Sequence, residues 1–394
     1  MKKLLIVNNN MKVGGVQKSL YNLLWSLDPA EYDVTLLLFS KVGAYLDNLP
    51  STVHVVEETG SFRLFGMSQG EYTGLDALKR GLLATVSRFL GRNTAVKMML
   101  PLQKTLDGQY DCAVAFLNNG PNDVLYGGVQ DYVLYRVNAK RKVVFLHSDY
   151  DRSGSHHPDN DRMMAQFDAI AACSEGCRRA FVAAKPDLAE RCMAVRNCHR
   201  YDEIRQLAEQ EISPYAEGET HAVTVARMTP RKGLDRAIRA TAAAKMAGTP
   251  VTLHIVGNGP MWERLQTLAK ELGVADAVIF HGEQSNPYPY IKQADFMFLT
   301  SYHEAAPMVI EEARCLGVPV LSTEIISTKE MVAEAQAGWV CDNDDRALVE
   351  TLCRVLADQE GIQAVRNHLL QTPMDNQEAL AQFATAVNGA STIV

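Results

Sequence analysis

Residues 295–323, DFMFLTSYHEAAPMVIEEARCLGVPVLST, contain a complete strand–helix–strand unit. The apolar run DFMFLTS (295–301) has the length of a buried strand, and VPVLST (318–323) has the same character. Between them, Pro307 suits the first turn of a helix and Gly317 suits its carboxyl cap, which predicts a helix over residues 307–316. Strands that are apolar throughout and alternate with helices indicate a parallel sheet covered on both faces.

The same alternation runs along most of the 394 residues. Two such blocks predict an α/β protein with two doubly wound, Rossmann-like domains that face each other across a cleft. The predicted strands are 3–9, 32–39, 53–58, 111–117, 142–147 and 168–174 in the first block, and 221–227, 251–257, 277–282, 295–301, 318–323 and 337–341 in the second.

The domain boundaries follow from this pattern and from the composition of the segment between the blocks. We expect residues 1–205 to form the N-terminal domain and residues 206–375 to form the C-terminal domain. The polar stretch EISPYAEGETH (211–221) carries Pro and Gly and is the best candidate for a linker. The last helix, within residues 376–394, is expected to return to the N-terminal domain.

The overall composition excludes some classes of protein. A formal net charge of −7 argues against attraction of the whole surface to nucleic acid. No apolar run approaches the roughly 18 residues of a membrane-spanning helix. The eight cysteines form no CxxC pair and lack the spacing of zinc ligands, so we expect reduced thiols in a cytoplasmic protein.

The stretch VARMTPRKGLDRAI follows the first strand of the second block. Arg227 ends that strand, and Lys232 stands next to Gly233 where a helix begins. Two cations beside a helix N-terminus can bind a diphosphate without a metal ion. The alternative is a solvated basic turn.

Glycine-rich loops follow two other strands. Gly14 and Gly15 open the helix after the first strand, and Gly257 and Gly259 allow close backbone approach after the strand at 251–257. For Gly14 and Gly15 the alternative is a plain tight turn, and the loop at Gly257 and Gly259 is weakly specific by itself. GG at 14–15 does not match G-x-G-x-x-G, which counts against a dinucleotide site.

His147 stands at the end of the strand at 142–147, a position that we expect to face the cleft. A histidine there is as often structural as functional. Asp149 and Asp151 form a D-x-D, a pattern that holds a divalent metal in a different architecture. Because that architecture lacks a second Rossmann domain, we expect no metal site here.

Glu304 and Glu312 lie eight positions apart, the first in the loop after a strand and the second on the following helix. A carboxylate can accept two hydrogen bonds from vicinal hydroxyls, so this pair could hold two diols of one ligand. The amides near residues 306–309 would point into the cleft. A nucleotide sugar offers a hexose, a diphosphate and a ribose in that order. The alternative is that Glu311 and Glu312 are two ordinary surface acids of the helix, where the dipole favours acids near the N-terminus.

Together these motifs resemble the retaining glycosyltransferases of family 4, which have the GT-B fold. VARMTPRKG, VGNGP, VIFHG, NPYPYIKQADFMFLTSYHEAAPMVIEEARCLGVPVLST and STKEMV are similar to the donor-binding half. GGVQKSLYNLL, VVFLHSDY, AACSE and VRNCHRYDEI match the acceptor-binding half more loosely. NPYPYIKQAD is especially like bacterial members that build surface polysaccharides or glycolipids.

The resemblance implies a hexose transfer from a nucleotide diphosphate sugar to a carbohydrate or lipid-linked acceptor, without cofactor or metal. Arg227 and Lys232 match the cations on the diphosphate, Glu304 the acid on the sugar, and Glu312 the acid on the ribose. His147 matches the histidine beside the reacting carbon. The implied catalytic residues are His147, Glu304, Arg227 and Lys232. The implied donor-binding residues are Gly14, Gly15, Arg227, Lys232, Gly257, Gly259, Glu304, Ala305, Ala306, Pro307, Met308, Val309 and Glu312.

One position departs from the family pattern. The glycine that usually follows the first glutamate is Ala305 here, and its methyl group could crowd the donor sugar. An alternative function is therefore a catalytically silent GT-B protein that binds a sugar nucleotide or supports a partner transferase.

Residues 76–106 are basic in an otherwise acidic chain. The segment from 79 to 104 has no acid, and its cations are Lys79, Arg80, Arg88, Arg92, Lys97 and Lys104. Leu78, Leu82, Val86 and Phe89 recur at helical spacing. Such a helix either packs on its own domain or lies on an anionic membrane, which would place the protein at the inner face of the membrane.

Overall fold

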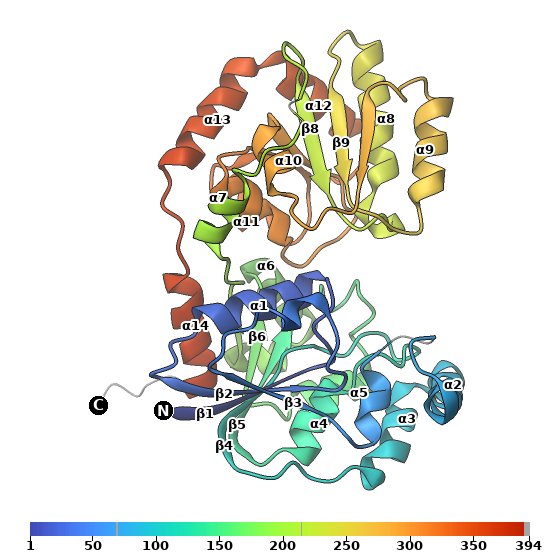
Figure 1. The fold of residues 1–394 in the computed structure, drawn as a ribbon, viewed down its shortest axis with the longest axis vertical. Coiled ribbons are helices and arrows are strands. Elements are labelled where there is room, and N and C mark those ends of the chain that lie inside the picture. Colours follow the sequence, from blue (N-terminus) through green and yellow to red (C-terminus); the bar gives the residue numbers. More distant parts are fainter. Residues whose placement is uncertain (68–69, 214, 390–394) are drawn as a thin grey trace. The chain divides into compact units, whose positions relative to one another are not determined.

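The computed structural model describes residues 1–67, 70–213 and 215–389, and these form two compact units (Figure 1). Unit 1 comprises Met1–Cys198 together with the C-terminal segment from Asn376, and unit 2 comprises His199–Asp375. Each unit has one parallel sheet with helices on both faces, as the sequence predicts. The predicted α/β fold class is confirmed.

The sheet of unit 1 has seven parallel strands in the order β3-β2-β1-β4-β5-β6-β7. Its strands are β1 (Lys2–Asn8), β2 (Tyr32–Leu38), β3 (Val53–Glu57), β4 (Tyr110–Ala115), β5 (Ala139–Leu146), β6 (Ala169–Ala172) and β7 (Cys192–Ala194). The helices are α1 (Gly15–Ser26), α2 (Gly74–Leu90), α3 (Arg92–Met99), α4 (Val129–Arg136), α5 (Pro158–Met164), α6 (Glu175–Ala184) and α14 (Gln377–Asn388). Six strands match the prediction, and β7 is an edge strand that the sequence analysis missed.

The last helix packs in unit 1 although it follows all of unit 2 in the sequence. α14 contacts β5 and β6 (Figure 1). Ala379, Phe383 and Val387 on this helix belong to an apolar core of unit 1. The side chain of Arg141 on β5 donates a hydrogen bond to the carbonyl of Ala386 over 2.8 Å. The chain therefore starts and ends its described part in the same unit.

The sheet of unit 2 has six parallel strands in the order β10-β9-β8-β11-β12-β13. Its strands are β8 (His221–Val225), β9 (Thr252–Val256), β10 (Val278–Gly282), β11 (Phe296–Leu299), β12 (Val320–Thr323) and β13 (Gly338–Cys341). The helices are α7 (Tyr201–Leu207), α8 (Leu234–Met246), α9 (Trp262–Glu271), α10 (Tyr288–Gln293), α11 (Met308–Cys315), α12 (Asp345–Ala357) and α13 (Gln359–Gln371).

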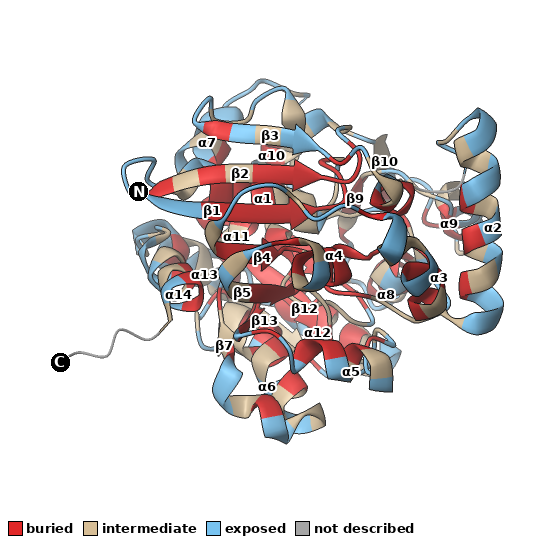
Figure 2. Ribbon diagram, turned by 90° about the horizontal axis from the view of Figure 1, so that it is seen from below, coloured by how far each residue is buried: buried red, intermediate tan, exposed pale blue. Residues whose placement is uncertain are grey.

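Strand β11 shows why the strands are apolar throughout. Phe296 and Phe298 belong to the core on one face of the sheet, whereas Met297 and Leu299 belong to the core on the other. All four side chains are at most 2% exposed. Because both faces are covered by helices, every position of the strand must be apolar. Figure 2 shows the central strands as buried elements.

The predicted linker is wrong. The compact units divide between Cys198 and His199, so residues 211–221 lie inside unit 2 and not between the units; Pro214 of this stretch lies outside the described residues. The physical reason is the packing of α7, which precedes that stretch. Ile204 and Ala208 are buried in the core of unit 2, which draws residues 199–205 into it.

The basic segment 76–106 is not one helix. α2 ends at Gly91, which has φ +85°, and α3 begins directly after it. Only part of the basic charge is on the surface, because Arg80 and Arg92 are buried. Arg80 donates to the carbonyl of Met67, and Arg92 donates to Asn160 Oδ1 over 2.7 Å. Among the described residues, no helix has the length and apolar character needed to cross a membrane.

Candidate functional site

Both sheets have a point at which the strand order reverses. In unit 1 it lies between β1 and β4, and in unit 2 between β8 and β11. In open parallel sheets, ligands bind at the carboxyl ends of the strands that flank such a point, because the following loops diverge there. The predicted residues Arg227, Lys232 and Glu304 all follow β8 or β11. Gly14 and Gly15 follow β1 in the other unit.

The structure brings Lys232 and Glu304 together. Lys232 ends a short 3₁₀ turn after β8, and its ammonium group forms an ion pair with Glu304 Oε1. Ser301 Oγ donates to the same carboxylate oxygen over 3.0 Å. The Lys232 and Glu304 side chains are 20% and 11% exposed, so neither charge is free in bulk water. An ammonium and a carboxylate therefore meet at the switch point of unit 2.

The turn that carries Lys232 depends on Gly233. This glycine is left-handed, with φ +60°, and ends the 3₁₀ turn where α8 begins. A Cβ atom at this position would lie 2.2 Å from the carbonyl oxygen of Thr300. Thr300 Oγ1 donates to the Gly233 carbonyl over 2.8 Å. The loops after β8 and β11 are thus in direct contact.

Arg227 lies in a loop that runs against the glycine loop after β9. The amide of Met228 donates to the carbonyl of Asn258, and the amide of Ala226 donates to that of Val256. A Cβ atom on Gly257 would lie 2.1 Å from the carbonyl oxygen of Ala226, and Gly257 has φ +134°. These glycines therefore bring two loops together, while Arg227 itself is exposed.

Glu312 lies on α11, which has the predicted bounds within one residue at each end. Pro307 precedes the first helical residue, Met308, and Gly317 has φ +71° just after the last turn. Glu312 is only 1% exposed, although it is a carboxylate on a helix. A buried acid is uncommon and marks a specific role more than a surface acid does. The alternative of two ordinary surface acids is thus unsupported for Glu312.

Residues 305–309 form the end of the loop and the first turn of α11. Ala305, Ala306 and Val309 are half-buried, whereas Pro307 and Met308 are buried. The first amides of a helix have no acceptor within the helix. Such amides can contribute to binding an anion or a hydroxyl group when a ligand approaches.

Gly14 and Gly15 begin α1 after the buried asparagines that end β1. Gly14 has φ 177°, an extended conformation that any residue adopts. A Cβ atom on Gly15 would meet no atom within 4 Å. The fold of unit 1 does not itself require glycine at Gly15, so the reason for a small residue lies outside the packing.

His147 follows β5, and its amide donates to Asn118 Oδ1 over 3.0 Å. Its ring lies against Phe116 and Phe145, with centroids 4.9 and 5.7 Å away. Burial in this aromatic setting lowers the pKa of His147 to about 4, so the imidazole is neutral at pH 7. Nε2 of His147 is buried and has no hydrogen-bond partner among residues 1–67, 70–213 and 215–389.

The two aspartates of the D-x-D pattern have separate partners. Asp149 is buried, and its Oδ1 accepts a hydrogen bond from the amide of Arg152 over 3.2 Å. Asp151 is 73% exposed and lies 3.3 Å from Nδ1 of His156. Asp149 thus stabilises the turn after β5.

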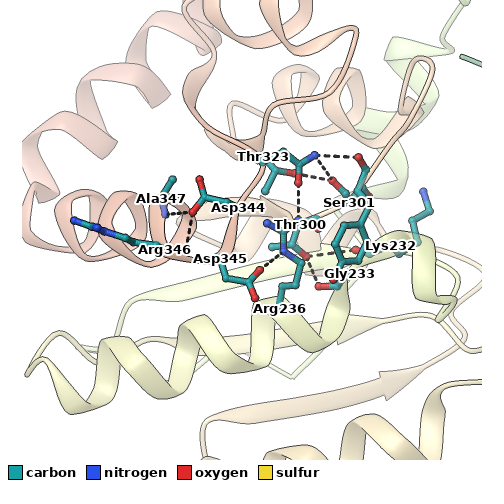
Figure 3. Close-up of polar contacts among 12 residues, drawn as sticks. Lys232, Gly233, Arg236, Thr300, Ser301, Thr323, Asp344, Asp345, Arg346 and Ala347 are labelled. Atoms are coloured by element: carbon teal, nitrogen blue, oxygen red, sulfur yellow. Dashed lines mark hydrogen bonds and ion pairs between the residues drawn. The ribbon is translucent and has the colours of Figure 1, made fainter. Parts of the chain in front are cut away.

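Two polar residues beside Lys232 and Glu304 were missed by the sequence analysis. Arg236 on α8 contacts the backbone of the loop that leads to Glu304 (Figure 3). Asn343, which follows β13, contacts the same loop. The signal in the sequence is weak. α8 carries three further charged residues, Asp235, Arg239 and Lys245, so charge alone does not single out Arg236, and nothing marks Asn343.

Residues 206–369 match the family model described as Glycosyl transferases group 1. The putative colanic acid biosynthesis glycosyltransferase WcaL of Escherichia coli (strain K12) is 34% identical over 139 residues, which cover 33% of this chain. That match spans only 34% of the relative's own length. The resemblance predicted from the sequence is confirmed at the level of group 1 glycosyltransferases, whereas membership of family 4 stays a prediction.

Solved structures resemble the chain over nearly its whole length. The lipopolysaccharide outer core galactosyltransferase WaaB in its apo form has a TM-score of 0.60 at 17% identity, covering 98% of this chain and 99% of that one. Anabaena Alr3699/HepE in complex with UDP and glucose has a TM-score of 0.66 at 19% identity, covering 99% and 100%. At these identities the likeness shows the fold, and the predicted GT-B architecture is confirmed.

Proposed function

We propose that this protein is a retaining glycosyltransferase that moves a hexose from a nucleotide diphosphate sugar to a carbohydrate or lipid-linked acceptor. The observation that carries the proposal is the ion pair of Lys232 and Glu304 at the switch point of unit 2. The group 1 match over residues 206–369 supports the reaction class. The similarity to a colanic acid biosynthesis enzyme supports a role in surface polysaccharide or glycolipid synthesis.

The donor site that we propose lies in unit 2. Lys232 and Arg227 would hold the diphosphate, since both follow β8 and precede the N-terminus of α8. Glu304 would accept hydrogen bonds from the hexose hydroxyls. Because Lys232 contacts Glu304, the sugar and the diphosphate would adjoin at this point. Glu312 would accept hydrogen bonds from the ribose, and its burial keeps that carboxylate fixed in place.

The acceptor site that we propose lies in unit 1. Open space at Gly15 would let a ligand approach the N-terminus of α1. The neutral imidazole of His147 has its Nε2 atom without a hydrogen-bond partner in the described part of the chain, so it can take part in one hydrogen bond with a sugar. It would therefore orient a hydroxyl rather than neutralise a charge.

In the proposed reaction, the bond between the anomeric carbon and the diphosphate oxygen breaks while the acceptor oxygen attacks from the same face. The acceptor proton passes to the departing diphosphate, and the new glycosidic bond keeps the original configuration. Negative charge grows on the diphosphate as it leaves. The side chains of Arg227 and Lys232 would stabilise that charge, so that no metal ion is needed.

The lipid-linked form of the acceptor is supported by α2, which presents an apolar face to solvent. The apolar stripe of α2 (Leu75, Leu78, Leu82 and Phe89) recurs at helical spacing, and each of its side chains is 64–76% exposed. Lys79 and Arg88 are exposed on the same helix. An exposed apolar stripe with basic neighbours fits the surface of an anionic bilayer. We therefore propose a cytoplasmic protein that contacts the inner face of the membrane through this stripe.

A thermal-shift screen of the purified chain against UDP, GDP, ADP and their sugars tests the proposed function. One nucleotide is expected to raise the melting temperature, because it binds only the folded state. The wild type should then hydrolyse the matching donor slowly, with EDTA present or absent, and Glu304→Ala should not, whereas Glu311→Ala should. Tight binding of a nucleotide sugar without turnover would instead identify a catalytically silent binding protein. If no nucleotide raised the melting temperature, both the transferase and the silent binding protein would be contradicted.

A further inference from the structure

Arg236 is a buried arginine among the apolar residues of unit 2. It is the third residue of α8, and it is 2% exposed. Its neighbours on the helix, Ala237 and Ile238, are core residues. A buried guanidinium group must be compensated by hydrogen bonds. Its partners therefore show what the side chain holds in place.

The guanidinium group of Arg236, which projects from α8, contacts two loops (Figure 3). Nε donates to Asp345 Oδ1 over 2.7 Å, and Nη1 donates to Asn343 Oδ1 over 2.6 Å. Nη1 also lies 3.4 Å from the carbonyl oxygen of Thr300, directly after β11. The central carbon of the group is 4.7 Å from the ring centroid of Tyr302. Arg236 thus links α8 to the loop after β11 and to the loop after β13.

Asn343 extends this contact along the same loop. Its Nδ2 atom lies within hydrogen-bond distance of three carbonyl oxygens, those of Ser301 (3.3 Å), Tyr302 (3.0 Å) and Glu324 (2.9 Å). Because its Oδ1 accepts from Arg236, the amide is oriented with Nδ2 toward these carbonyls. Residues 301 and 302 are therefore held from the side of β13.

The opposite side of the loop is held by the turn that carries Lys232. The amide of Tyr302 donates to the carbonyl of Arg231 over 2.9 Å, and Thr300 Oγ1 donates to the carbonyl of Gly233 over 2.8 Å. Glu304 stands two residues after Tyr302. Residues 300–302 thus set the position of Glu304 relative to Lys232. Arg236 and Asn343 contact the same residues on the other side of the loop.

Stability alone does not explain this arrangement. Asp345, the acidic partner of Arg236, is 70% exposed, and Nη2 of Arg236 has no hydrogen-bond partner within the described residues. A buried charge with incomplete pairing contributes little to folding compared with an apolar residue of similar size. What the planar guanidinium group does provide is a rigid spacing between several acceptors.

We propose that Arg236 and Asn343 are positioning residues, which set the loop 300–304 so that Glu304 and Lys232 meet at the donor sugar. This inference rests on the proposed function for its effect on turnover. Its structural part, the placement of the loop, stands on the contacts described above. Neither residue is expected to touch the donor.

The test compares Arg236→Met and Asn343→Ala with controls on the same elements. Arg239→Met is the control on α8, and Asp342→Ala is the control beside Asn343, because both residues are exposed. Hydrogen exchange of the amides of residues 300–304 reports the loop, and donor hydrolysis reports turnover. Asn343→Ala removes only a half-buried side chain, so it keeps the test decisive if Arg236→Met does not fold.

Both test variants are expected to exchange amide 302 at least 10-fold faster than the wild type. They should also lower kcat at least 10-fold while changing the KM of the donor less than 3-fold. Arg236→Lys should not restore kcat, because one ammonium cannot span the same acceptors. Unchanged exchange, or equal kcat in test and control variants, would overturn the inference. A wild type that neither binds nor hydrolyses any nucleotide sugar would overturn the proposed function instead. The exchange rates would still show whether Arg236 and Asn343 position the loop 300–304.

Discussion

Glycine has different physical roles at Gly257 and Gly15. At Gly257 the backbone has φ +134°, and an added Cβ atom would collide with the carbonyl of Ala226. At Gly15 an added methyl group meets nothing within 4 Å. Only at Gly15, therefore, can a requirement for glycine come from a ligand.

Alanine substitutions separate these two roles. Gly257→Ala should lower the free energy of unfolding by at least about 1–3 kcal/mol, the cost of the backbone strain, to which the collision with Ala226 adds. Gly15→Ala should leave it unchanged or raise it by up to about 1 kcal/mol, because alanine favours a helix. Donor hydrolysis by Gly15→Ala should nevertheless fall about 10-fold. Urea unfolding and initial rates measure both quantities, and full activity of Gly15→Ala would show that no ligand approaches there.

Glu312 provides a second prediction at the residue scale. Hydrogen bonds to a charged group contribute about 1.5–3 kcal/mol, so Glu312→Gln should raise the KM of the donor about 10- to 100-fold. Glu311→Gln is the matched control on the same helix, since the Glu311 carboxylate is paired with Arg314 at 2.5 Å. Equal KM values for the two variants would contradict a role of Glu312 in binding the ribose.

Single site residues could be predicted from the sequence where a charged residue directly follows an apolar strand. Glu304 and Lys232 stand just after strands, so the topology of a parallel sheet leads to them. Asn343 was not predictable, because its role depends on three carbonyl groups from two distant loops. Every residue has a backbone carbonyl group, so the sequence does not show which of these groups accept a side-chain hydrogen bond.

At the scale of elements, α2 carries the prediction about the membrane. Leu82→Glu and Phe89→Glu should each weaken binding to anionic vesicles about 10-fold, because burial of one such side chain contributes about 1.5–3 kcal/mol. Met246→Glu is the control, since Met246 is also exposed, at 89%, but lies on α8. Sedimentation with vesicles of anionic and of neutral lipid measures the effect. Equal vesicle binding by all variants would show that the apolar stripe of α2 does not bind the membrane.

Strands marked by an apolar run were predicted correctly, even those of four residues such as β11, whereas β7 and the break in the basic segment were not. β7 has only three residues and lies at the edge of the sheet, so no apolar run marks it. Gly91 divides the basic segment because its left-handed backbone ends α2. The spacing of Leu78, Leu82 and Phe89 did indicate one helical face, but it could not show that this face is exposed.

At the scale of the whole molecule, stability is expected to depend on pH through buried imidazoles. His221 Nδ1 lies 3.0 Å from His254 Nε2, and His254 Nδ1 lies 2.9 Å from His281 Nε2. The ring of Tyr215 stacks on His254 with centroids 3.6 Å apart. Burial first, and then the neighbouring imidazoles, lower the pKa of His254 to about 3.

The sign of the pH effect follows from this depressed pKa. Below the ordinary pKa of about 6.5, the unfolded chain binds a proton at His254 that the folded chain does not. The contribution of His254 to stability should therefore be complete above about pH 6.5 and fall toward acid, by about 2 kcal/mol at pH 5. Urea unfolding of His254→Gln should show a smaller loss between pH 8 and pH 5, whereas the exposed His368→Gln should behave as the wild type. If both variants lost the same free energy of unfolding between pH 8 and pH 5, the pH effect could not be assigned to His254.

The number and type of domains were predictable for the whole chain, because two blocks of alternating strands and helices each require a covered sheet. The boundary was not. Polarity and Pro–Gly content placed the linker at 211–221, but the packing of Ile204 draws the preceding helix into unit 2. A few buried side chains decide which of two domains a short helix packs against. The sequence does not show which of its side chains become buried.

The central claim is that Lys232 holds the diphosphate of a donor whose sugar contacts Glu304. Calorimetric titration of wild type, Lys232→Met and Glu304→Gln with a nucleoside diphosphate and with its sugar tests it most directly. Lys232→Met should bind both ligands at least 10-fold more weakly than the wild type. Glu304→Gln should lose affinity only for the sugar nucleotide and should bind the free diphosphate as tightly as the wild type or more tightly, because Lys232 is released from its ion pair. Equal affinities in all three proteins, or a parallel loss of both ligands in Glu304→Gln, would contradict the account.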